Sequence, residues 1–212
     1  MTEMPVPQIK ICGVTSLVDA RLVHDAGADA LGLIYATSVR QVVADVAGDI
    51  VERYAGRLWC VGVFRYQEDH EIVRIVERDA LPVVQLHDPA SERLLDALAQ
   101  RDVRVIRALN VHATALNDLE RERVVAVIVD GAQPGSGVAN DWASVKTLDF
   151  GVPVIVAGGL DAHNVAAVID DVNPWGVDVA SGVEVSHGVK DPAKVASFVA
   201  RARAALTQKG AQ

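Results

Sequence analysis

Short runs of aliphatic and β-branched residues alternate with amphipathic segments along the whole chain, and this alternation limits the possible folds more than any other feature. Each run is short enough for one buried strand. The segments between the runs carry apolar residues near positions i, i+3, i+4 and i+7, the spacing of an amphipathic helix. Eight such units predict an α/β protein whose parallel sheet closes into a (β/α)8 barrel, the TIM-barrel architecture, in preference to an open sheet. The predicted strands cover residues 8–12, 30–35, 59–64, 83–86, 103–109, 124–130, 153–157 and 177–180.

We expect residues 1–212 to form a single domain, because no low-complexity linker and no shift of composition divides the chain. Half of the residues are hydrophobic but only 4% are aromatic, which suits a parallel sheet buried on both faces. Ser16 followed by Asp19 is typical of a helix start, and Gly27 of a helix end. In such a barrel the active site is expected at the carboxyl ends of the strands.

The charge and the cysteines restrict the partners and the compartment. A formal net charge of −8 disfavours nucleic acid and anionic membranes as partners and favours a small molecule. The two cysteines, Cys12 and Cys60, each lie in an apolar run far from the other, which indicates free thiols in a reducing compartment. No apolar stretch reaches the roughly 18–20 residues of a membrane span, and the N-terminal residues lack the pattern of a signal peptide. We therefore expect a cytoplasmic protein.

Two residues at the ends of predicted strands are candidates for proton transfer. Cys12 shares a strand face with Lys10, whose charge, together with the dipole of the following helix, should lower the pKa of the thiol. Asp130 ends the run VVAVIVD, where partial desolvation should raise the pKa of its carboxyl and let it hold a proton to donate. The alternatives are an inert buried thiol and a carboxylate that caps a loop. Cys60, early in its strand, is expected to be a core residue.

Glycines follow the last two predicted strands, the place where barrels of this kind often bind phosphate through backbone N–H groups. Gly158-Gly159 follows the seventh strand and Ser181-Gly182 the eighth. Glycine lets the backbone approach phosphate oxygens closely and adopt unusual dihedral angles. One such loop alone is a weak signal, but the two together predict a phosphate site.

Two further side chains are candidates for substrate binding. Arg40 follows the second strand and could fork onto a carboxylate, with a solvated loop arginine as the alternative. His87 follows the fourth strand and could hydrogen-bond to substrate or to the neighbourhood of Gln85, with simple loop packing as the alternative. For proton transfer His87 is a weaker candidate than Cys12 or Asp130.

Several motifs in these segments give the chain a family resemblance. KICGVT, VQLH and the C-terminal GVDVASGVEVSHGVKD form a highly specific set, with GADALGLIY, VGVF, PGSGVANDW and VAGGLDAHNV between them in the same order. Over nearly its whole length the sequence resembles the phosphoribosylanthranilate isomerase family of tryptophan biosynthesis. The resemblance implies an aldose–ketose isomerase, an intramolecular oxidoreductase. Its reaction would be the Amadori rearrangement of N-(5-phosphoribosyl)anthranilate to 1-(2-carboxyphenylamino)-1-deoxyribulose 5-phosphate.

The resemblance also implies roles for the residues singled out above. Asp130 would be the acid that protonates the ribose ring oxygen, Cys12 the base that takes the proton from C2, and Arg40 the partner of the anthranilate carboxylate. The phosphate would lie at the Gly158-Gly159 and Ser181-Gly182 loops. No metal and no organic cofactor is implied, and the chain would act as a monomer or a homodimer.

Two other interpretations remain open. One is a bifunctional sugar-phosphate isomerase that also serves histidine biosynthesis, but such enzymes use a pair of acids, whereas the first strand here ends in Cys12. The other is a silent barrel that has kept phosphate binding and serves as an interaction module. Retention of both Cys12 and Asp130 argues against the second interpretation.

Overall fold

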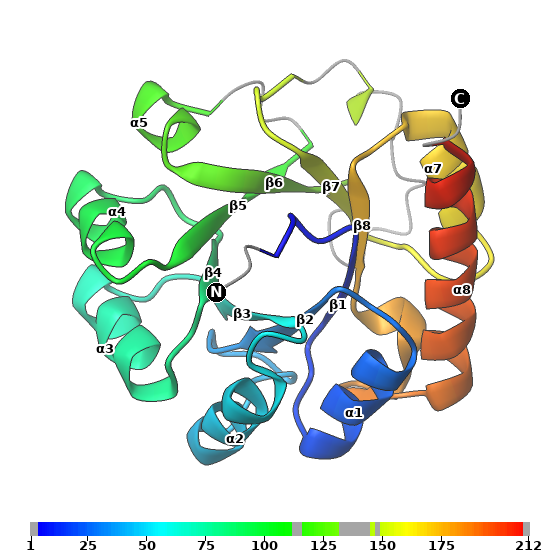
Figure 1. Ribbon diagram of the computed structural model, residues 1–212, viewed down its shortest axis with the longest axis horizontal. Coiled ribbons are helices and arrows are strands. Elements are labelled where there is room, and N and C mark those ends of the chain that lie inside the picture. Colours follow the sequence, from blue (N-terminus) through cyan, green and yellow to red (C-terminus); the bar gives the residue numbers. More distant parts are fainter. Residues whose placement is uncertain (1–3, 112–115, 132–144, 147–148, 210–212) are drawn as a thin grey trace.

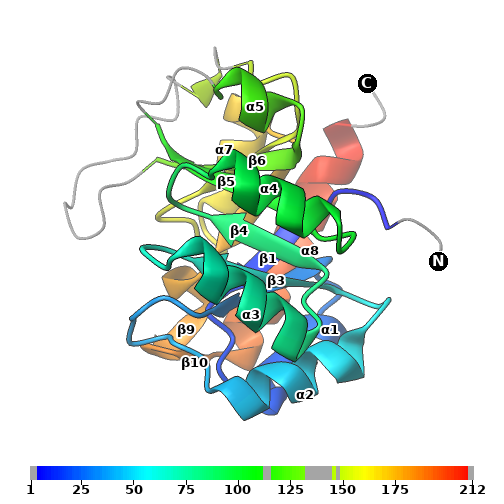
Figure 2. The same cartoon turned by 90° about the vertical axis from the view of Figure 1, so that its left-hand side faces the viewer.

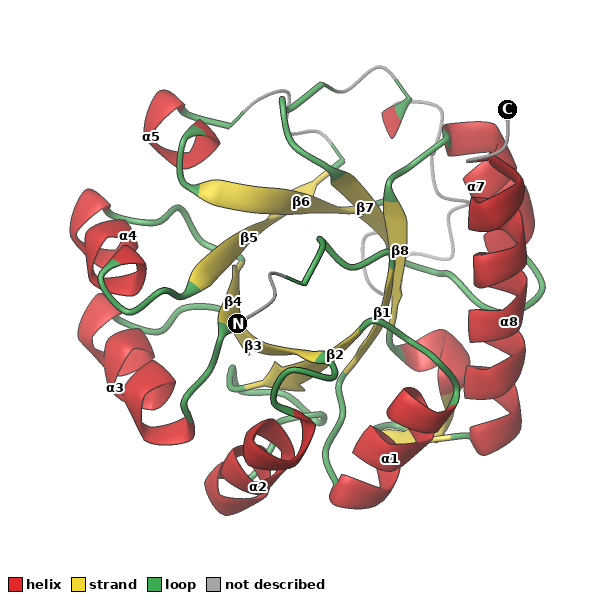
Figure 3. Ribbon diagram, viewed as in Figure 1, coloured by secondary structure: helices red, strands yellow, loops and turns green. Residues whose placement is uncertain are grey.

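The computed structural model describes residues 4–111, 116–131, 145–146 and 149–209. These residues form a single α/β domain in which eight parallel strands close into a barrel, with the helices packed around its outside (Figures 1 and 3). The strands are β1 (Ile9–Cys12), β2 (Ala30–Ile34), β3 (Trp59–Phe64), β4 (Val83–Leu86), β5 (Arg104–Asn110), β6 (Val124–Asp130), β7 (Val154–Ala157) and β8 (Gly176–Val179).

The closing contact of the barrel joins the first strand to the last. Residues Ile9 and Lys10 of β1 pair with Val177 and Asp178 of β8. All the remaining pairings join strands that are consecutive in the sequence. The predicted fold is therefore confirmed. The predicted strand boundaries differ from the observed ones by one residue at most, because the aliphatic runs that mark the strands end where the polar loops begin.

The helices lie where the amphipathic segments predict them. Ser16 caps the first helix by accepting a hydrogen bond from the Asp19 N–H, and Gly27 and Gly56 follow helix ends with positive φ angles of 82° and 70°. Among the described residues the helices are α1 (Leu17–Asp25), α2 (Ala44–Tyr54), α3 (Asp69–Asp79), α4 (Glu92–Ala99), α5 (Asp118–Arg121), α7 (Val165–Val172) and α8 (Pro192–Lys209).

Two apolar layers stabilise the barrel. The larger layer lies between the strands and the helices, and the smaller one fills the inside of the barrel around Trp59, Val61 and Ile106. Met4 and Val6 pack against the inner layer, so the N-terminal segment covers the amino end of the barrel (Figures 1 and 2). This end is therefore filled with apolar side chains, and polar side chains gather toward the other.

A small antiparallel pair of strands, β9 (Glu184–Ser186) and β10 (Val189–Lys190), follows β8. Together with the 3-10 turn η1 (Ser181–Val183), it lies at the carboxyl end of the barrel, opposite the N-terminal segment that begins at Met4 (Figure 2). The sequence did not predict this pair, because its strands are short and carry mostly exposed residues. In the described part of the chain, no helix is both long and apolar enough to cross a membrane.

Candidate active site

Cys12 lies at the carboxyl end of β1, next to a buried ion pair inside the barrel. The Lys10 ammonium lies 2.9 Å from the Asp178 carboxylate of β8, and Lys10 is completely buried. Burial is the largest single effect and would lower the pKa of Lys10, but the charges and hydrogen bonds of Asp178 and Cys12 together outweigh it, so the pKa of this ammonium is raised and Lys10 stays charged. A fixed positive charge therefore lies beside the Cys12 thiol.

Gly32 of β2 leaves the space in which these two side chains meet. A Cβ atom at Gly32 would lie 2.7 Å from the Cys12 sulfur and 3.2 Å from the Lys10 Nζ. Both atoms therefore lie close to the same point above Gly32, and any larger side chain there would push them apart. The predicted proximity of Lys10 and Cys12 on one strand face is present in the structure.

The predicted direction of the Cys12 pKa shift was wrong. Burial raises the pKa of the Cys12 thiol above its ordinary value, and the nearby cations Lys10 and Lys190 only partly offset this effect. The sequence places Lys10 next to Cys12, but it does not show that Cys12 is only 8% exposed. Without a ligand, Cys12 therefore holds its proton at neutral pH. Cys60 is also buried, and burial raises the pKa of its thiol to about 12.

His87 lies just beyond β4, and its ring Nε2 is 3.2 Å from the side-chain nitrogen of Gln85. Burial lowers the pKa of His87 to about 4, and the charges of Lys10 and Arg65 act in the same direction. His87 as a residue is nevertheless exposed, and water weakens such effects. His87 is thus a neutral hydrogen-bonding group at physiological pH.

We predict that His87 titrates with a midpoint between about 4 and the ordinary value of 6.5. Because its pKa in the folded state lies below that of the unfolded chain, its contribution to stability is fully present above pH 6.5. That contribution is lost as the pH falls toward 4. NMR titration of the imidazole signals checks this, with His87→Gln to identify the resonance. A midpoint at or above 6.5 would show that neither desolvation nor the charges of Lys10 and Arg65 lower the pKa of this imidazole.

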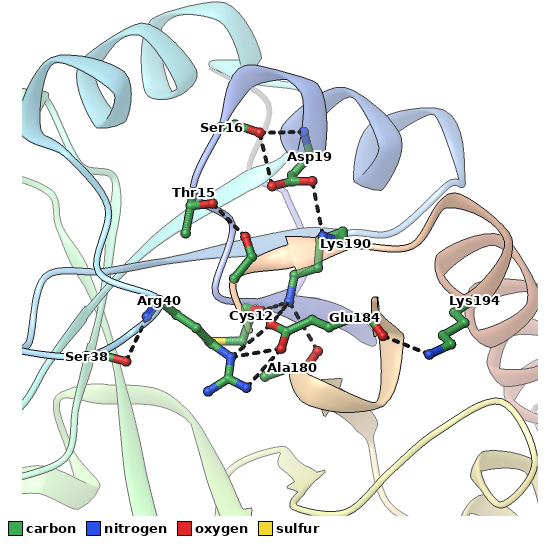
Figure 4. Close-up of polar contacts among 11 residues, drawn as sticks. Cys12, Thr15, Ser16, Asp19, Ser38, Arg40, Ala180, Glu184, Lys190 and Lys194 are labelled. Carbon is green, nitrogen blue, oxygen red and sulfur yellow. Dashed lines mark hydrogen bonds and ion pairs between the residues drawn. The ribbon is translucent and has the colours of Figure 1, made fainter. Parts of the chain in front are cut away.

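Arg40 lies in the loop after β2, and its guanidinium forms an ion pair with Glu184 of β9 (Figure 4). Its Nε lies 2.8 Å and 3.1 Å from the two carboxylate oxygens, and its Nη2 lies 2.9 Å from one of them. Its side chain also crosses Gly13, the residue after Cys12, where an added Cβ would lie 2.8 Å from the Arg40 Cδ. The predicted fork onto a carboxylate therefore exists, but the partner is a carboxylate of the chain itself.

Lys190 of β10 contacts the Glu184 carboxylate of this ion pair and joins the ends of two strands. Its ammonium donates hydrogen bonds to the Cys12 carbonyl at 2.6 Å, the Ala180 carbonyl at 3.1 Å and the Glu184 carboxylate at 2.9 Å (Figure 4). These three bonds use all three of its N–H donors, and its side chain is fully buried. Lys190 thus ties the end of β1, where Cys12 lies, to the residue before η1.

Asp130 ends β6 on the inward-facing side of the barrel. Ala126 and Ile128 of the same strand belong to the inner apolar layer, and side chains alternate along a strand, so Asp130 shares their face. It is half-buried, at the same end of the barrel as Cys12. Residues 132–144, which contain the PGSGVANDW motif, lie outside the described part of the chain.

The two glycine loops predicted to bind phosphate are in direct contact. Gly158 and Gly159 follow β7 with positive φ angles of 87° and 63°, which non-glycine residues rarely adopt. A Cβ atom on Gly182 of η1 would overlap the carbonyl oxygen of Leu160, so only glycine allows this close approach. The structure therefore brings Gly158-Gly159 and Ser181-Gly182 together, with Gly159 and Ser181 exposed.

A cavity of about 590 Å³ lies elsewhere, lined by the loops after β2 and β3 and by helix α3. Tyr35, Thr37, Arg65 and Tyr66 are among the residues that line it. Neither Cys12 nor any of the other predicted site residues lines it, so we do not assign it to the chemistry. The carboxyl end of the barrel is where the proton-transfer candidates and the glycine loops meet.

Sequence reasoning missed Asp178, Glu184 and Lys190. Each of them is buried and charged, and each pairs with a residue that is remote in sequence or in a different element. Asp178 interrupts the apolar run of β8, and Glu184 and Lys190 lie in the GVEVSHGVK segment, so charges in otherwise apolar surroundings were the available signal. A buried charge requires a partner, but the sequence alone does not name that partner.

The closed parallel barrel, with an acid, a thiol and paired glycine loops gathered at its carboxyl end, defines the class of (β/α)8-barrel enzymes. The profile of the N-(5'-phosphoribosyl)anthranilate (PRA) isomerase family matches residues 9–201. The chain belongs to the PRA isomerase family. Its reaction is the conversion of N-(5'-phosphoribosyl)anthranilate to 1-(2-carboxyphenylamino)-1-deoxyribulose 5-phosphate, an intramolecular isomerisation in tryptophan biosynthesis.

Individual members of this family are similar to the chain over almost their full length. The isomerase of Magnetococcus marinus is 40% identical over 212 residues, covering 96% of this chain and 98% of the relative. That of Desulforudis audaxviator is 38% identical over 205 residues, covering 93% and 98%. The solved phosphoribosylanthranilate isomerase of Thermus thermophilus superposes with a TM-score of 0.80 at 36% identity, covering 93% of this chain and 98% of that one.

Two other solved structures bear on ligands and assembly. One is a phosphoribosylanthranilate isomerase in complex with reduced 1-(o-carboxyphenylamino)-1-deoxyribulose 5-phosphate, with a TM-score of 0.75 and 30% identity, covering 94% of this chain and all of that one. The other shows generated monomers of the dimeric isomerase of Thermotoga maritima, with a TM-score of 0.74 and 29% identity at the same coverage. A phosphorylated ligand and a dimer are thus both known among relatives.

Proposed function

We propose that Cys12 and Asp130 are the base and the acid of this isomerisation. The observation that carries the proposal is the position of the Cys12 thiol, which lies at the carboxyl end of β1 beside the permanently charged Lys10. Asp130 donates its proton to the ribose ring oxygen, the C1–O bond breaks, and the substrate nitrogen becomes an iminium. The Cys12 thiolate then removes the proton from C2, the electron pair moves to the nitrogen, and the resulting enolamine tautomerises to the ketone.

The raised pKa of Cys12 fits this order of events. The buried thiol keeps its proton until the ring-opened substrate adds its positive charge; the thiol then releases that proton to water, and the thiolate is left to act as the base. Lys10 and Lys190 supply fixed positive charge, and the ring-opened substrate supplies a further positive charge on its iminium nitrogen. The same iminium acidifies C2, so the reaction requires neither a metal nor an organic cofactor. The base thus becomes active when its substrate is in place.

The substrate is held at three points in this proposal. Its phosphate binds the backbone of the Gly158-Gly159 and Ser181-Gly182 loops, where glycine permits close approach. His87, neutral and hydrogen-bonded to Gln85, contacts the sugar portion. Arg40 keeps two of its donor groups on Glu184 and turns Nη1 toward the anthranilate carboxylate. We further propose that the protein acts in the cytoplasm, as a monomer or a homodimer.

Replacing Arg40 by alanine should chiefly raise KM, by about 10-fold or more, and leave kcat within a few-fold of the wild type. The lost interaction is a charged hydrogen bond that binds the ground state and the transition state equally. Steady-state kinetics, followed by the loss of substrate fluorescence, measure both constants. Arg65→Ala is the matched control, because Arg65 lies in the next loop and stacks on Tyr66. An unchanged KM in Arg40→Ala would remove Arg40 from the binding site.

A further inference from the structure

A cluster of three buried or half-buried charges, formed by Arg40, Glu184 and Lys190, lies around the end of β1 (Figure 4). The Glu184 side chain is only 3% exposed and accepts hydrogen bonds from both cations. Desolvation alone would raise the pKa of Glu184, but the bonds from Arg40 and Lys190 outweigh it, so the pKa lies below its ordinary range. Glu184 is therefore ionised, and the cluster holds two positive charges and one negative charge.

The excess of one positive charge in this cluster favours the binding of an anion. Burial of unbalanced charge is unfavourable, and an anionic group that approached the cluster would reduce the cost. Lys190 has no N–H donor left, because all three are bonded inside the protein. Arg40, in contrast, uses Nε and Nη2, and among the described residues its Nη1 donates no hydrogen bond. The donor left for a ligand anion is thus the outer edge of Arg40.

The position of that edge depends on Glu184. The bonds to Nε and Nη2 fix the plane of the guanidinium, and the arginine stem rests on Gly13, directly after Cys12. Glu184 itself is held from both sides, because the Lys194 ammonium of α8 donates a hydrogen bond to its backbone carbonyl at 2.7 Å. A bidentate ion pair restricts the orientation of a guanidinium, whereas a solvated arginine side chain is free to turn.

We propose that Glu184 is a positioning residue that aims Arg40 at the carboxylate of the substrate, with Lys190 holding Glu184 in register with Cys12. This inference rests on the proposed role of Arg40 as the carboxylate-binding residue. It assigns a function to β9 and β10, which place Glu184 and Lys190 next to the end of β1. A purely stabilising role accounts for it less well, because apolar side chains often replace buried ion pairs without loss of stability.

The test compares two ligands that differ only in the carboxylate. One is the reduced product analogue, which carries the carboxyphenyl group, and the other is the same compound with an unsubstituted phenyl group. Glu184→Asp keeps the negative charge but withdraws it by one methylene, so it changes the geometry and not the charge. The affinity ratio is the affinity for the carboxyphenyl compound divided by the affinity for the phenyl compound. We expect Glu184→Asp to lower this ratio about 10-fold, the order of the loss when a charged hydrogen bond is misaligned, and to change kcat less than KM.

Glu184→Gln provides the second variant, since it keeps the length of the side chain and removes the charge. Positioning predicts that the ratio falls in this variant too. If Glu184 only screened the cations, its neutralisation would tighten binding of the carboxylate and the ratio would rise. Glu77→Gln is the matched control. Glu77 lies on α3, away from the site, and its carboxylate forms an ion pair with the Arg101 guanidinium at 2.6 Å. It should leave the ratio unchanged.

Comparison with Arg40→Ala separates this inference from the proposal beneath it. If Arg40→Ala lowers the ratio and both Glu184 variants leave it unchanged, Arg40 binds the carboxylate without help and the inference is wrong. If Arg40→Ala also leaves the ratio unchanged, the proposed role of Arg40 fails. In the Arg40→Ala background, Glu184→Asp should have no further effect on the ratio, which a double-mutant cycle measures. The ratio is a property of folded protein only, so a loss of stability does not imitate the result.

Discussion

Replacement of Cys12 by alanine is expected to lower kcat by at least about 100-fold, the smallest loss typical for removal of a general base. The methyl group of alanine accepts no proton, so C2 of the ring-opened substrate keeps its hydrogen. The free energy of unfolding should change by only about 1 kcal/mol, because a single small side chain is removed. The measurement is the initial rate of loss of substrate fluorescence at saturating substrate, together with a denaturant titration of each protein.

The second cysteine provides the control. Cys60 is buried in the layer between the strands and the helices, so Cys60→Ala should keep kcat near the wild-type value while losing a similar amount of stability. Wild-type turnover by Cys12→Ala would show that another group is the base. Equal losses of kcat in both variants would show that the effect comes from packing and not from chemistry.

Replacement of Asp130 by asparagine should also lower kcat by at least about 100-fold. The amide has nearly the shape of the carboxyl group, but it has no acidic proton to give to the ring oxygen. Substrate should still bind, because the phosphate and the carboxylate are held by other residues, so KM should change much less than kcat. Steady-state kinetics of the purified variant measure both constants.

Asp118 supplies a matched substitution for this experiment. It lies exposed at the start of α5, and Asp118→Asn should leave both kinetic constants unchanged. A variant Asp130→Asn that turns over like the wild type would assign the acid to a different residue. Loss of stability without loss of kcat would indicate that Asp130 serves only to cap its loop.

The fold could be predicted from the sequence because its main signals are local. The run VVAVIVD marks β6 over the observed residues Val124–Asp130, and WCVGVF marks β3 over Trp59–Phe64. A strand in a parallel barrel is buried on both faces, so its residues are apolar almost without interruption. The hairpin of β9 and β10 escaped prediction because its Val185 and Val189 are exposed and its inward residues are charged.

The candidate site could be predicted in outline but not in its electrostatics. The positions of Cys12 and the glycine loops follow from where strands end, a property that the sequence displays directly. The pKa of Cys12 did not follow, because desolvation depends on how deeply the fold buries the sulfur, and here burial outweighs the neighbouring Lys10. Likewise, the pairing of Arg40 with Glu184 joins residues 144 positions apart, which no local pattern shows.

The position of a bound product analogue tests the central claim most directly. A crystal structure of this protein with reduced 1-(o-carboxyphenylamino)-1-deoxyribulose 5-phosphate should show C2 of the sugar within about 4 Å of the Cys12 sulfur, close to the separation of reacting atoms. The phosphate should contact the backbone of Gly159 and Gly182, and the Asp130 carboxyl should lie near the oxygen that leaves C1. An analogue bound with its C2 turned away from the sulfur, or with its phosphate outside the glycine loops, would contradict the proposed site.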